Sequence, residues 1–499
     1  MKFVDRDLTD IHSITRDEIE YVISKAALIK RAIAEKDLDA YRLAGDRDLI
    51  VSLLFYENST RTRSSFEIAA MRMGLSVTGF TGVEGTSVQK GESLRHTLDM
   101  FEAYRCDAVI LRHPLDGSAR FAADHVKVPV FNAGDGKHEH PTQTLLDLFT
   151  IYEHLKKLDG ISVGMGGDLK YGRTVHSLAI ALSLFNDVEL HLYSHPSLRM
   201  PQPIIDLVTA GGVSVTVHEN MNDLLPEVDI FYSTRIQKER MPDPLEYERA
   251  KDAGRFKAAM MKNTRDSFGL MHPLPMNKEA PSIDPGLDCH PKSIFKAQAG
   301  NGVPTRLVEL ALSLGLMGDD FQGQMYEDPV ELEEFYDELE IMHKPYKTEQ
   351  AIRPIRDGEG VVIDHLKPYS EEILTRLLHT RERSSIYRAG TVRSHKVPAR
   401  IKGLLMIEDR ELDEQEMRLV STVSPGCRIN FIRKGKVARK LQMRLPHRIQ
   451  GLHDLLCPNT GCITRPEHHE RVSPVMIRVD EENVRCYYCD TVMQSGKAF

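Results

Sequence analysis

The sequence predicts an α/β protein with two doubly wound parallel-sheet subdomains, followed by a small βαββαβ domain and a β-rich, cysteine-bearing domain. Three observations predict this organisation. Apolar strand-like runs alternate with helical patterns over residues 1–315, an acidic segment follows, and four of the seven cysteines lie in the last 50 residues. We expect boundaries at 1–140 (completed by a helix at about 300–317), 141–299, 318–350, 351–448 and 449–499.

Composition narrows the functional class. The chain has 499 residues with 41% hydrophobic content, which is ordinary for about three or four globular domains. Its start lacks the apolar core of a signal peptide, and no run approaches the length of a membrane helix. Seven cysteines without a signal favour thiols or metal ligands in a reducing compartment. We therefore expect a cytoplasmic protein without a membrane partner.

The first strand-to-helix junction carries an anion-binding pattern. The apolar run Leu49–Tyr56 has the length of a buried strand, and apolar residues recur at helical spacing from Phe66 to Met73. Between them lies Ser59-Thr60-Arg61-Thr62-Arg63. Free N–H groups and the helix dipole suit an anion there, and arginine adds paired donors for phosphate or carboxylate. The alternative is an ordinary helix cap with solvated arginines.

Later junctions repeat this arrangement of polar groups after strands. Arg112 ends the run Val109–Leu111, and Gly134-Asp135-Gly136 leads to His140 at the start of a helix. A histidine at a helix N-terminus is biased toward the neutral imidazole, which can donate one hydrogen bond to a carbonyl oxygen.

Two further strands end close to arginine. Ile161–Asp168 precedes Arg173, and Asp229–Thr234 precedes Arg235. The glycines of the first strand form an incomplete dinucleotide fingerprint, and no acidic residue ends the next strand. Open α/β sheets bind ligands at the carboxyl ends of their strands, so these arginines predict a ligand with several negative groups. No P-loop, nucleophile elbow or H-E-x-x-H motif occurs.

The acidic segment has two interpretations. Ten acidic residues and no lysine or arginine lie between Asp319 and Glu340, which favours a solvated tether. Leu332, Phe335, Leu339 and Met342 keep a helical spacing, which favours an acidic helix instead. Beyond it, strands are expected at Val361–Ile363, Gly403–Ile407 and Ile429–Ile432, with helices at Ile373–Leu378 and Glu414–Val420. This order predicts the βαββαβ domain.

Cys457, Cys462, Cys486 and Cys489 form two close pairs, the arrangement that tetrahedral zinc requires. Four thiolates leave no open position, so we expect structural zinc in a segment too short for its own core. Cys106, Cys289 and Cys427 are expected to be small buried hydrophobes. Residues 433–448 carry seven Lys and Arg and no acid, which raises a nucleic-acid hypothesis, although the chain has a net charge of −8.

The first part of the chain resembles a known family. The resemblance is to the catalytic chain of aspartate carbamoyltransferase, over roughly residues 5–315. It is carried by Ser59–Arg63, Arg112–Pro114, His140–Thr144, Asp168–Thr174, Thr234–Arg240 and His272–Pro275. Ornithine carbamoyltransferases share the first and third of these segments but read H-C-L-P in place of His272–Pro275. Met276 stands where better-known members have arginine.

The resemblance implies carbamoyl phosphate and L-aspartate as substrates, without an organic cofactor. It assigns the phosphate to Ser59, Thr60, Arg61 and Thr62. It assigns polarisation of the carbonyl oxygen to Arg112, His140 and Thr62, and orientation of the carbamoyl group to Gln143 and the backbone of Leu274 and Pro275. It assigns the two aspartate carboxylates to Arg173, Arg235 and Gln237. The catalytic residues expected are Arg61, Thr62, Arg112 and His140.

The family supplies one loop of each site from a neighbouring subunit. Here that loop is Gly82–Gly91, with Ser87 and Lys90, and it is one residue shorter before Lys90. The resemblance therefore implies trimeric catalytic units with shared sites.

A second resemblance covers roughly residues 350–499. Val361–His365, Leu445–Ile449 and the four cysteines resemble the regulatory chain of bacterial aspartate carbamoyltransferase. This implies an ATP or CTP effector site with Asp364, His365 and Lys440. A pocket lysine of the family aligns with Met406, and Arg433–Lys440 is longer than the family's segment. Trimers from the first part and dimers from the second imply a homo-oligomer of six chains.

The leading hypothesis is a fused catalytic–regulatory aspartate carbamoyltransferase that makes N-carbamoyl-L-aspartate and phosphate for pyrimidine biosynthesis and binds no nucleic acid. One alternative is an ornithine carbamoyltransferase. The other is a nucleic-acid-binding zinc protein whose α/β part no longer catalyses.

Overall fold

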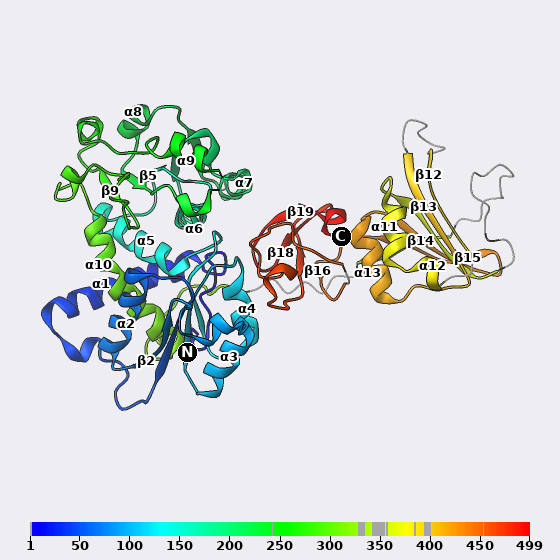
Figure 1. Ribbon diagram of the computed structural model, residues 1–499, viewed down its shortest axis with the longest axis horizontal. Helices are drawn as coiled ribbons and strands as arrows, with labels where there is room; N and C mark the ends of the chain where they lie inside the picture. The colour runs from blue at the N-terminus through cyan, green and yellow to red at the C-terminus, as the bar shows by residue number, and fades with distance from the viewer. Residues whose placement is uncertain are drawn as a thin grey trace. The chain divides into compact units, whose positions relative to one another are not determined.

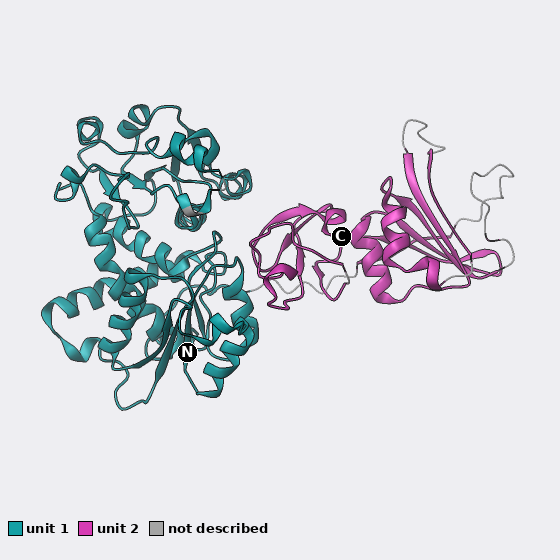
Figure 2. Cartoon of the chain, viewed as in Figure 1, with its two compact units in different colours: residues 1–328 teal, residues 329–499 magenta. Residues whose placement is uncertain are grey.

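The computed structural model describes residues 2–241, 243–327, 335–341, 355, 358–383, 386–393, 401–452 and 454–499. The chain forms two compact units, Met1–Asp328 and Pro329–Phe499 (Figure 2). Within the described ranges, no helix combines the length and the apolar character that crossing a bilayer demands.

Unit 1 begins with a four-stranded parallel sheet of order β2-β1-β3-β4 (Figure 1). Its strands are β1 (Ile50–Phe55), β2 (Ser76–Thr81), β3 (Ala108–His113) and β4 (Val130–Asp135). The helices of this part are α1 (Arg16–Glu35), α2 (Thr60–Met73), α3 (Leu94–Ala103) and α4 (Ser118–His125). The apolar run and the helical spacing around Ser59–Arg63 thus become β1 and α2, as the sequence predicts.

A second parallel sheet, of order β7-β6-β5-β8-β9, completes unit 1. Its strands are β5 (Ser162–Gly166), β6 (Glu189–Tyr193), β7 (Ser214–Val217), β8 (Ile230–Ser233) and β9 (Gly269–Met271). The helices are α5 (Pro141–Leu155), α6 (Arg173–Leu182), α7 (Gln202–Ala210), α8 (Met221–Leu224), α9 (Pro244–Ala250) and α10 (Phe295–Ser313). The expected pair of doubly wound parallel sheets is confirmed.

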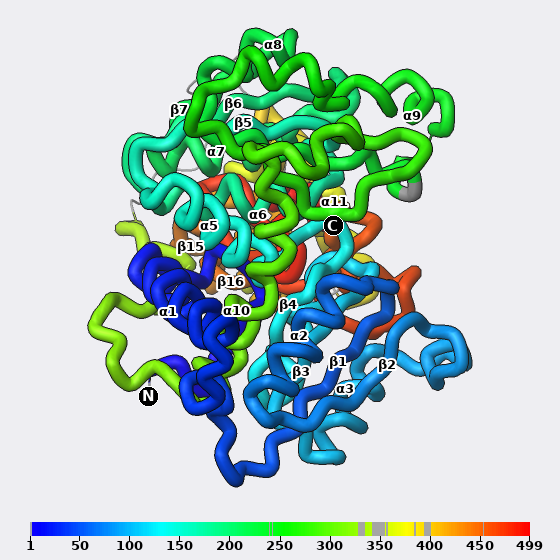
Figure 3. The backbone as a smooth tube through the Cα atoms, turned by 90° about the vertical axis from the view of Figure 1, so that its left-hand side faces the viewer, coloured from blue at the N-terminus to red at the C-terminus, as the bar shows by residue number. Residues whose placement is uncertain are grey.

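Helix packing joins the sheets into one unit. Helix α10 packs against α1, α2 and α5, and Figure 3 shows it running from the second sheet to the first. One apolar core includes side chains from both sheets, for example Val51 of β1 and Val163 of β5. Because this shared core is densely packed, it fixes the position of the carboxyl ends of one sheet relative to those of the other.

Helix α10 also buries a carboxylate. Glu309 is 3% exposed, and neither carboxylate oxygen has a hydrogen-bond partner among the described residues. Burial raises the pKa of Glu309 to about 8, although the charge of Arg306 opposes the shift. As pH rises, the folded state therefore keeps this proton at pH values at which the unfolded chain has already lost it.

This raised pKa predicts a loss of stability as pH rises from about 4.5 to 8. Between pH 4 and pH 7 the Glu309 contribution should fall by about 3 kcal/mol. Glu309→Gln should remove this decrease in the free energy of unfolding. Calorimetry of the unit 1 transition at several pH values measures it. Glu35→Gln, on the exposed face of α1, is the control; equal pH dependence of Glu309→Gln and wild type would contradict the assignment.

Unit 2 begins with a six-stranded antiparallel sheet of order β10-β15-β14-β11-β13-β12. Its strands are β10 (Tyr336–Glu338), β11 (Gly360–Leu366), β12 (Tyr387–Arg393), β13 (Ile401–Glu408), β14 (Arg428–Arg433) and β15 (Lys436–Met443). Its helices are α11 (Ser370–Leu377), α12 (Thr380–Arg383) and α13 (Glu414–Val423). The predicted βαββαβ order is confirmed for β11 to β14, and β10 and β15 extend the sheet.

The segment 318–350 is not a tether over its full length. Phe321 is buried in the unit 1 core, with its ring 5.0 Å from that of Phe3. Tyr336–Glu338 forms strand β10 and pairs with β15, so Phe335 and Leu339 lie beside a strand rather than on a helix. Leu332 and Met342 lie outside the described residues. Opposite charges favour the pairing, because Arg444 contacts Asp337 and Arg439 lies 3.4 Å from Glu338.

The same pairing changes the interpretation of the basic run at 433–448. Arg433 binds Glu411 at 2.7 Å, and Arg439 and Arg444 contact the acidic strand β10. Arg448 lies over the ring of Tyr487 at 4.8 Å. Four of the seven basic side chains therefore have partners inside unit 2, which weakens the nucleic-acid alternative.

The chain ends in a four-stranded antiparallel sheet of order β16-β17-β18-β19. Its strands are β16 (Arg448–Ile449), β17 (Met476–Arg478), β18 (Asn483–Cys486) and β19 (Val492–Gln494). Cys486 ends β18, and Cys457, Cys462 and Cys489 lie in the connections outside these strands. The expected β-rich, cysteine-bearing domain is confirmed.

Candidate active site and metal centre

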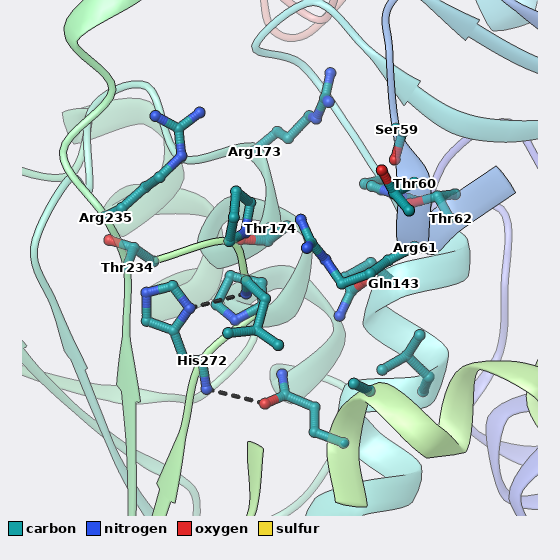
Figure 4. A pocket seen from close by; sticks show the side chains of 18 of the residues that line it. Ser59, Thr60, Arg61, Thr62, Gln143, Arg173, Thr174, Thr234, Arg235 and His272 are labelled. Carbon is teal, nitrogen blue, oxygen red and sulfur yellow. Dashed lines mark hydrogen bonds between the residues drawn. The ribbon is translucent and has the colours of Figure 1, made fainter. Parts of the chain in front are cut away.

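A cavity of about 420 Å³ opens where the carboxyl ends of the two parallel sheets meet (Figure 4). Twelve of the fourteen residues expected to contact substrate line it. They are Ser59, Thr60, Arg61, Thr62, Arg112, His140, Gln143, Arg173, Arg235, Gln237, Leu274 and Pro275. Residues separated by up to 216 positions thus meet in one cavity.

The N-terminus of α2 forms one side of the cavity. Ser59 is the residue before the helix, and its side chain makes no capping hydrogen bond. The simple helix-cap interpretation of Ser59 therefore fails. Figure 4 shows Ser59, Thr60 and Thr62 grouped at this helix start with Arg61 beside them. Hydroxyls, backbone N–H groups and a guanidinium converge there, which is the chemistry of an anion site.

Arg112 and Arg173 lie side by side behind this site. Arg112 donates to the carbonyl of Ala133 at 3.0 Å, and Arg173 donates to that of Gly136 at 2.7 Å. A Cβ atom at Gly134, where φ is +111°, would lie 2.7 Å from Cζ of Arg173 and 3.0 Å from Nη1 of Arg112. Glycine at this position is what lets both guanidiniums approach the strand end.

Glu57 is the carboxylate shared by this arginine pair. Its Oε2 lies 3.5 Å from Nη2 of Arg112 and 3.7 Å from Nη2 of Arg173. Glu57 was not among the residues predicted from the sequence, although it lies two residues before the Ser59–Arg63 motif.

The cationic groups in the cavity are poorly compensated. Burial lowers the pKa of Arg112 and of Arg173. The charges of Arg240 and Arg61 lower the pKa of Arg112 further, and the charges of Arg112 and Arg240 lower that of Arg173. Burial also lowers the pKa of Arg61, with a smaller contribution from Arg235 across the cavity. Such shifts arise where like charges crowd together, so anions in the cavity would relieve the repulsion.

His140 is a neutral hydrogen-bond donor. Burial, followed by the charges of Arg173, Arg112 and Arg306, lowers its pKa well below the usual value. The sequence predicted the neutral form from the helix N-terminus, whereas burial and the arginines are the main causes. Its Nδ1 lies 3.3 Å from Thr142 Oγ1, and a hydroxyl donating to Nδ1 leaves the ring proton on Nε2.

A buried network orients Gln143. Its amide donates to Asp147 at 2.9 Å, and Asp147 also accepts from Gln298 at 2.7 Å and from Tyr232 at 2.7 Å. Gln298 in turn accepts from the backbone N–H of His272 at 2.9 Å. This chain connects α5, α10 and the turn after β9. Asp147 was missed by the sequence analysis, although its spacing of four residues from Gln143 on one helix is a usable signal.

The far side of the cavity is built on Asp168. This buried carboxylate accepts from the backbone N–H of Gln237 at 3.2 Å and of Tyr171 at 2.9 Å. The side chain of Gln237 donates to the carbonyl of Tyr171 at 3.0 Å. Figure 4 shows Arg235 on this side, away from the α2 site, with Arg173 between Arg235 and Ser59. The cavity thus offers two separate positions for negative groups.

Arg306 is a fifth arginine in the cavity wall that the sequence analysis missed. It lies on α10, where it contacts Ser65 Oγ and stacks on the ring of Phe66 at 5.0 Å. A single arginine inside an apolar helical stripe was its only signal in the sequence.

Ser87 and Lys90 do not line the cavity. They form the short helix η2 (Ser87–Lys90), and both side chains are exposed. Met276 packs against the apolar cluster around Phe268 and Leu270 and does not line the cavity either.

The three expected effector residues lie on strands of the unit 2 sheet. Asp364 of β11 accepts from Lys402 at 2.6 Å and contacts His365 at 2.9 Å. Lys440 of β15 pairs with Asn430 of β14, and Asn430 pairs with Val362 of β11. Asp364 lies two residues after Val362 on β11, so both side chains are on the same face of that strand. Partners in register share a face, so Asp364 and Lys440 lie on the same face of the sheet.

That face lies opposite the helices. The alternate residues Val361 and Ile363 form the core with α11 and α13. Met406 pairs with Val362, and Arg388 of the edge strand reaches its sulfur at 3.5 Å. Lys402 and Arg388 were not predicted from the sequence, because strand pairing brings them to this face.

The four cysteines form a buried metal-binding cluster. Their sulfur atoms all lie within 4.8 Å of one another, with 3.5 Å between Cys457 and Cys489 and 3.8 Å between Cys462 and Cys486. Tetrahedral zinc with bonds of about 2.3 Å separates sulfurs by roughly 3.8 Å, so the set fits such an ion. Cys106 and Cys427 are buried as expected, but Cys289 is exposed, because its sequence neighbours Asp288 and His290 lie in a surface turn.

Four family models match the chain in succession. Residues 6–153 match the carbamoyl-P binding domain and residues 159–311 the Asp/Orn binding domain of aspartate/ornithine carbamoyltransferase. Residues 350–444 match the allosteric domain and residues 447–498 the metal binding domain of the aspartate carbamoyltransferase regulatory chain.

Individual relatives agree with the first two matches. The aspartate carbamoyltransferase catalytic subunit of Thermococcus onnurineus is 44% identical over 317 residues, which cover 64% of this chain and 99% of that protein. The catalytic subunit of Methanosarcina barkeri is 43% identical over 317 residues, covering 64% of this chain and 100% of that protein.

Solved structures extend the comparison to the fold. The catalytic subunit of M. jannaschii aspartate transcarbamoylase is 40% identical, covers 62% of this chain and 97% of its own, and has a TM-score of 0.56. The Trypanosoma cruzi enzyme, solved with carbamoyl phosphate and aspartate, is 32% identical, covers 63% of this chain and 98% of its own, and has a TM-score of 0.57. The ornithine and nucleic-acid alternatives gain no support from these relatives. The chain belongs to the aspartate carbamoyltransferase family and carries its catalytic domains and its regulatory-chain domains in one polypeptide.

Proposed function

We propose that the cavity of unit 1 transfers the carbamoyl group of carbamoyl phosphate to the amine of L-aspartate. The observation that carries this proposal is the presence of two separate groups of anion-binding side chains in one cavity, which His140 and Arg112 also line. The products are N-carbamoyl-L-aspartate and phosphate, for pyrimidine biosynthesis.

In this proposal, Ser59, Thr60, Arg61 and Thr62 hold the phosphate. The donors of the α2 N-terminus are supplied by backbone that folding has already fixed, so little reorganisation accompanies binding. The guanidinium of Arg61 adds two parallel donors that fit phosphate oxygens.

Arg112, His140 and Thr62 are proposed to polarise the carbonyl oxygen. Negative charge grows on this oxygen as the amine attacks, and donors aimed at it lower the barrier. A neutral His140 donates through Nε2 without giving up its proton. Gln143, together with the backbone of Leu274 and Pro275, orients the carbamoyl group, and the Asp147 network keeps Gln143 in place.

Arg173, Arg235 and Gln237 are proposed to bind the two carboxylates of aspartate. This places the amine toward the carbamoyl carbon. The amine forms the new C–N bond, the C–O bond to phosphate breaks, and the departing phosphate accepts the amine proton. Positioning and charge stabilisation carry the reaction, without a covalent enzyme intermediate.

A direct comparison of acceptors tests the substrate. With carbamoyl phosphate held constant, aspartate should be carbamoylated, and ornithine should react at least about 10³-fold more slowly, because its cationic side chain would face Arg173 and Arg235. Product formation from each acceptor is the measurement. Equal or faster reaction with ornithine would contradict the proposed role of the two arginines.

Ser87 and Lys90 are proposed to enter the site of a neighbouring subunit. Their exposure and their absence from the cavity of their own chain support this. The catalytic parts then form trimers, and dimers of the regulatory parts give a six-chain assembly, which a native mass measurement tests.

Asp364, His365 and Lys440 are proposed to contact an ATP or CTP effector on the helix-free face of the unit 2 sheet. The lysines Lys402 and Lys440 on this face support phosphate binding. Lys440→Ala should weaken nucleotide binding by about 10–100-fold, as expected for a lost charged hydrogen bond. Equilibrium dialysis measures this, with Lys434→Ala in the exposed β14–β15 turn as the control.

If neither ATP nor CTP binds to the wild-type chain, the proposal of an effector site is wrong even when catalysis is intact.

The cysteine cluster is proposed to hold zinc as a structural ion. Four reduced thiolates fit a reducing compartment, and we propose the cytoplasm.

A further inference from the structure

A cluster of two histidines and two glutamates lies on the second sheet of unit 1, away from the substrate cavity. His191 is in the middle of β6, His218 directly follows β7, and Glu227 ends the short helix η4 (Leu225–Glu227). Glu189 begins β6. None of these residues lines the cavity, and none belongs to the proposed reaction.

The three nearest donor atoms have the spacing of metal ligands. His191 Nδ1 lies 2.9 Å from His218 Nε2 and 3.3 Å from Glu227 Oε2. Ligand atoms of these three residues all lie within 4.8 Å of one another. A tetrahedral ion with bonds of about 2.0–2.1 Å separates its ligands by roughly 3.3 Å, so shifts of a few tenths of an ångström open the site.

The contacts within the cluster favour a cation. His191 Nδ1 and His218 Nε2 lie 2.9 Å apart, and two protonated rings would repel at that distance, so at least one nitrogen of the pair offers a lone pair. Glu227 and Glu189 place carboxylate oxygens 3.3 Å and 3.7 Å from the ring nitrogens of His191, and a divalent ion balances their negative charge.

A carboxylate stands behind the buried histidine in the position of an orienting partner. Glu189 Oε2 lies 3.7 Å from His191 Nε2, the nitrogen that faces away from His218. The hydroxyl of Ser162 donates to the same Glu189 oxygen at 2.9 Å and helps to hold it. Ligating histidines commonly direct their second nitrogen at such a carboxylate, which fixes the ring.

The backbone holds the ligands on neighbouring elements. Strands β6 and β7 pair in parallel (Figure 3), and the N–H of His218 donates to the carbonyl of Leu192 at 2.9 Å. The side chain of His191 is 7% exposed, whereas that of Glu227 is 54% exposed. One ligand is therefore fixed inside the sheet, and another can adjust from the surface.

We propose that His191, His218 and Glu227 bind a divalent transition-metal ion of the Zn²⁺ or Co²⁺ class, with Glu189 orienting His191. Two imidazoles and one carboxylate form a ligand set that suits these ions. The ion links the edge strand β7 to β6 and η4, and it is separate from the four-cysteine centre.

Metal counting on the untagged full chain tests the proposal. After equilibrium dialysis against Zn²⁺, wild type should hold two ions per chain and His218→Ala one. Loss of a direct ligand should weaken this site by more than about 100-fold, whereas Glu189→Gln, an outer-shell change, should weaken it by about 10–100-fold. Glu227→Gln repeats the ligand test at an exposed side chain, where a substitution of this size should not disturb the apolar core.

Two controls separate this site from other sources of metal. His125→Ala removes a histidine that contacts a single carboxylate, Asp99, and should leave the count at two. Cys486→Ser should abolish the cysteine-bound ion and leave the second one. With Co²⁺, the second ion should show ligand-field absorption without thiolate charge transfer.

One ion per chain in wild type overturns the proposal. So does a second ion that survives both His218→Ala and Glu227→Gln with unchanged affinity. Neither result bears on carbamoyl transfer, which the acceptor assay measures independently.

Discussion

Arg61→Ala is expected to lower kcat/KM for carbamoyl phosphate by about 10³-fold, at the upper end of the loss for a single preorganised donor. Arg61 stands at the N-terminus of α2 and lines the cavity. Its guanidinium is proposed to meet phosphate oxygens both in the bound substrate and as the phosphate leaves. Steady-state kinetics with varied carbamoyl phosphate measures the effect.

The neighbouring arginine of the same motif is the matched control. Arg63 also lies on α2, but it does not line the cavity and it binds Glu67 at 2.7 Å, one helical turn away. Arg63→Ala removes a partly buried pair that does not reach the cavity, so kcat/KM should change by less than about threefold. Arg61→Lys should recover part of the activity, because it keeps the charge and loses the paired donors. Wild-type kinetics in Arg61→Ala would remove the basis of the phosphate assignment.

Cys486→Ser is expected to release the cysteine-bound metal and unfold the segment around residues 449–499. The strands β16 to β19 have two to four residues each, so this part of the chain buries little apolar surface without the ion. Structural zinc contributes apparent free energies of about 10–16 kcal/mol in small domains, more than such a segment can replace. Metal content and limited proteolysis of the C-terminal region measure the loss.

Cys289→Ser provides the control, because Cys289 is exposed and lies outside the cluster. Its metal content and proteolysis pattern should match the wild type. Unit 1 has its own apolar core, so carbamoyl transfer should remain measurable in Cys486→Ser. Full metal content with an intact C-terminal segment in Cys486→Ser would show that the cluster is not the metal centre.

Local patterns predicted the fold class well. The apolar run Leu49–Tyr56, the helical spacing after it and the later repeats of this pattern produced the expected parallel sheets. The βαββαβ order of the regulatory part also followed from short-range periodicity. These features depend on neighbours within a few residues, which a sequence displays directly.

The acidic segment shows where local patterns failed. Its composition favoured a tether and its apolar spacing a helix, yet Tyr336–Glu338 pairs with β15 about 100 residues later. Backbone pairing holds this strand against β15, and Arg439 of β15 and Arg444 just after it contact its acidic side chains. A partner so distant leaves no periodic signal in the acidic segment itself.

The sequence by itself determined the chemistry of this protein: arginines and hydroxyls at strand ends for anions, and four thiolates for a metal. Those residue types bind such groups wherever they lie. Only the tertiary structure decided how the groups cooperate. Folding brings Glu57 between Arg112 and Arg173, places Gln298 of α10 on Asp147 of α5, and adds Arg306 to the cavity wall. These contacts join residues dozens to hundreds of positions apart, and they arise from the packing of helices and sheets rather than from any local pattern.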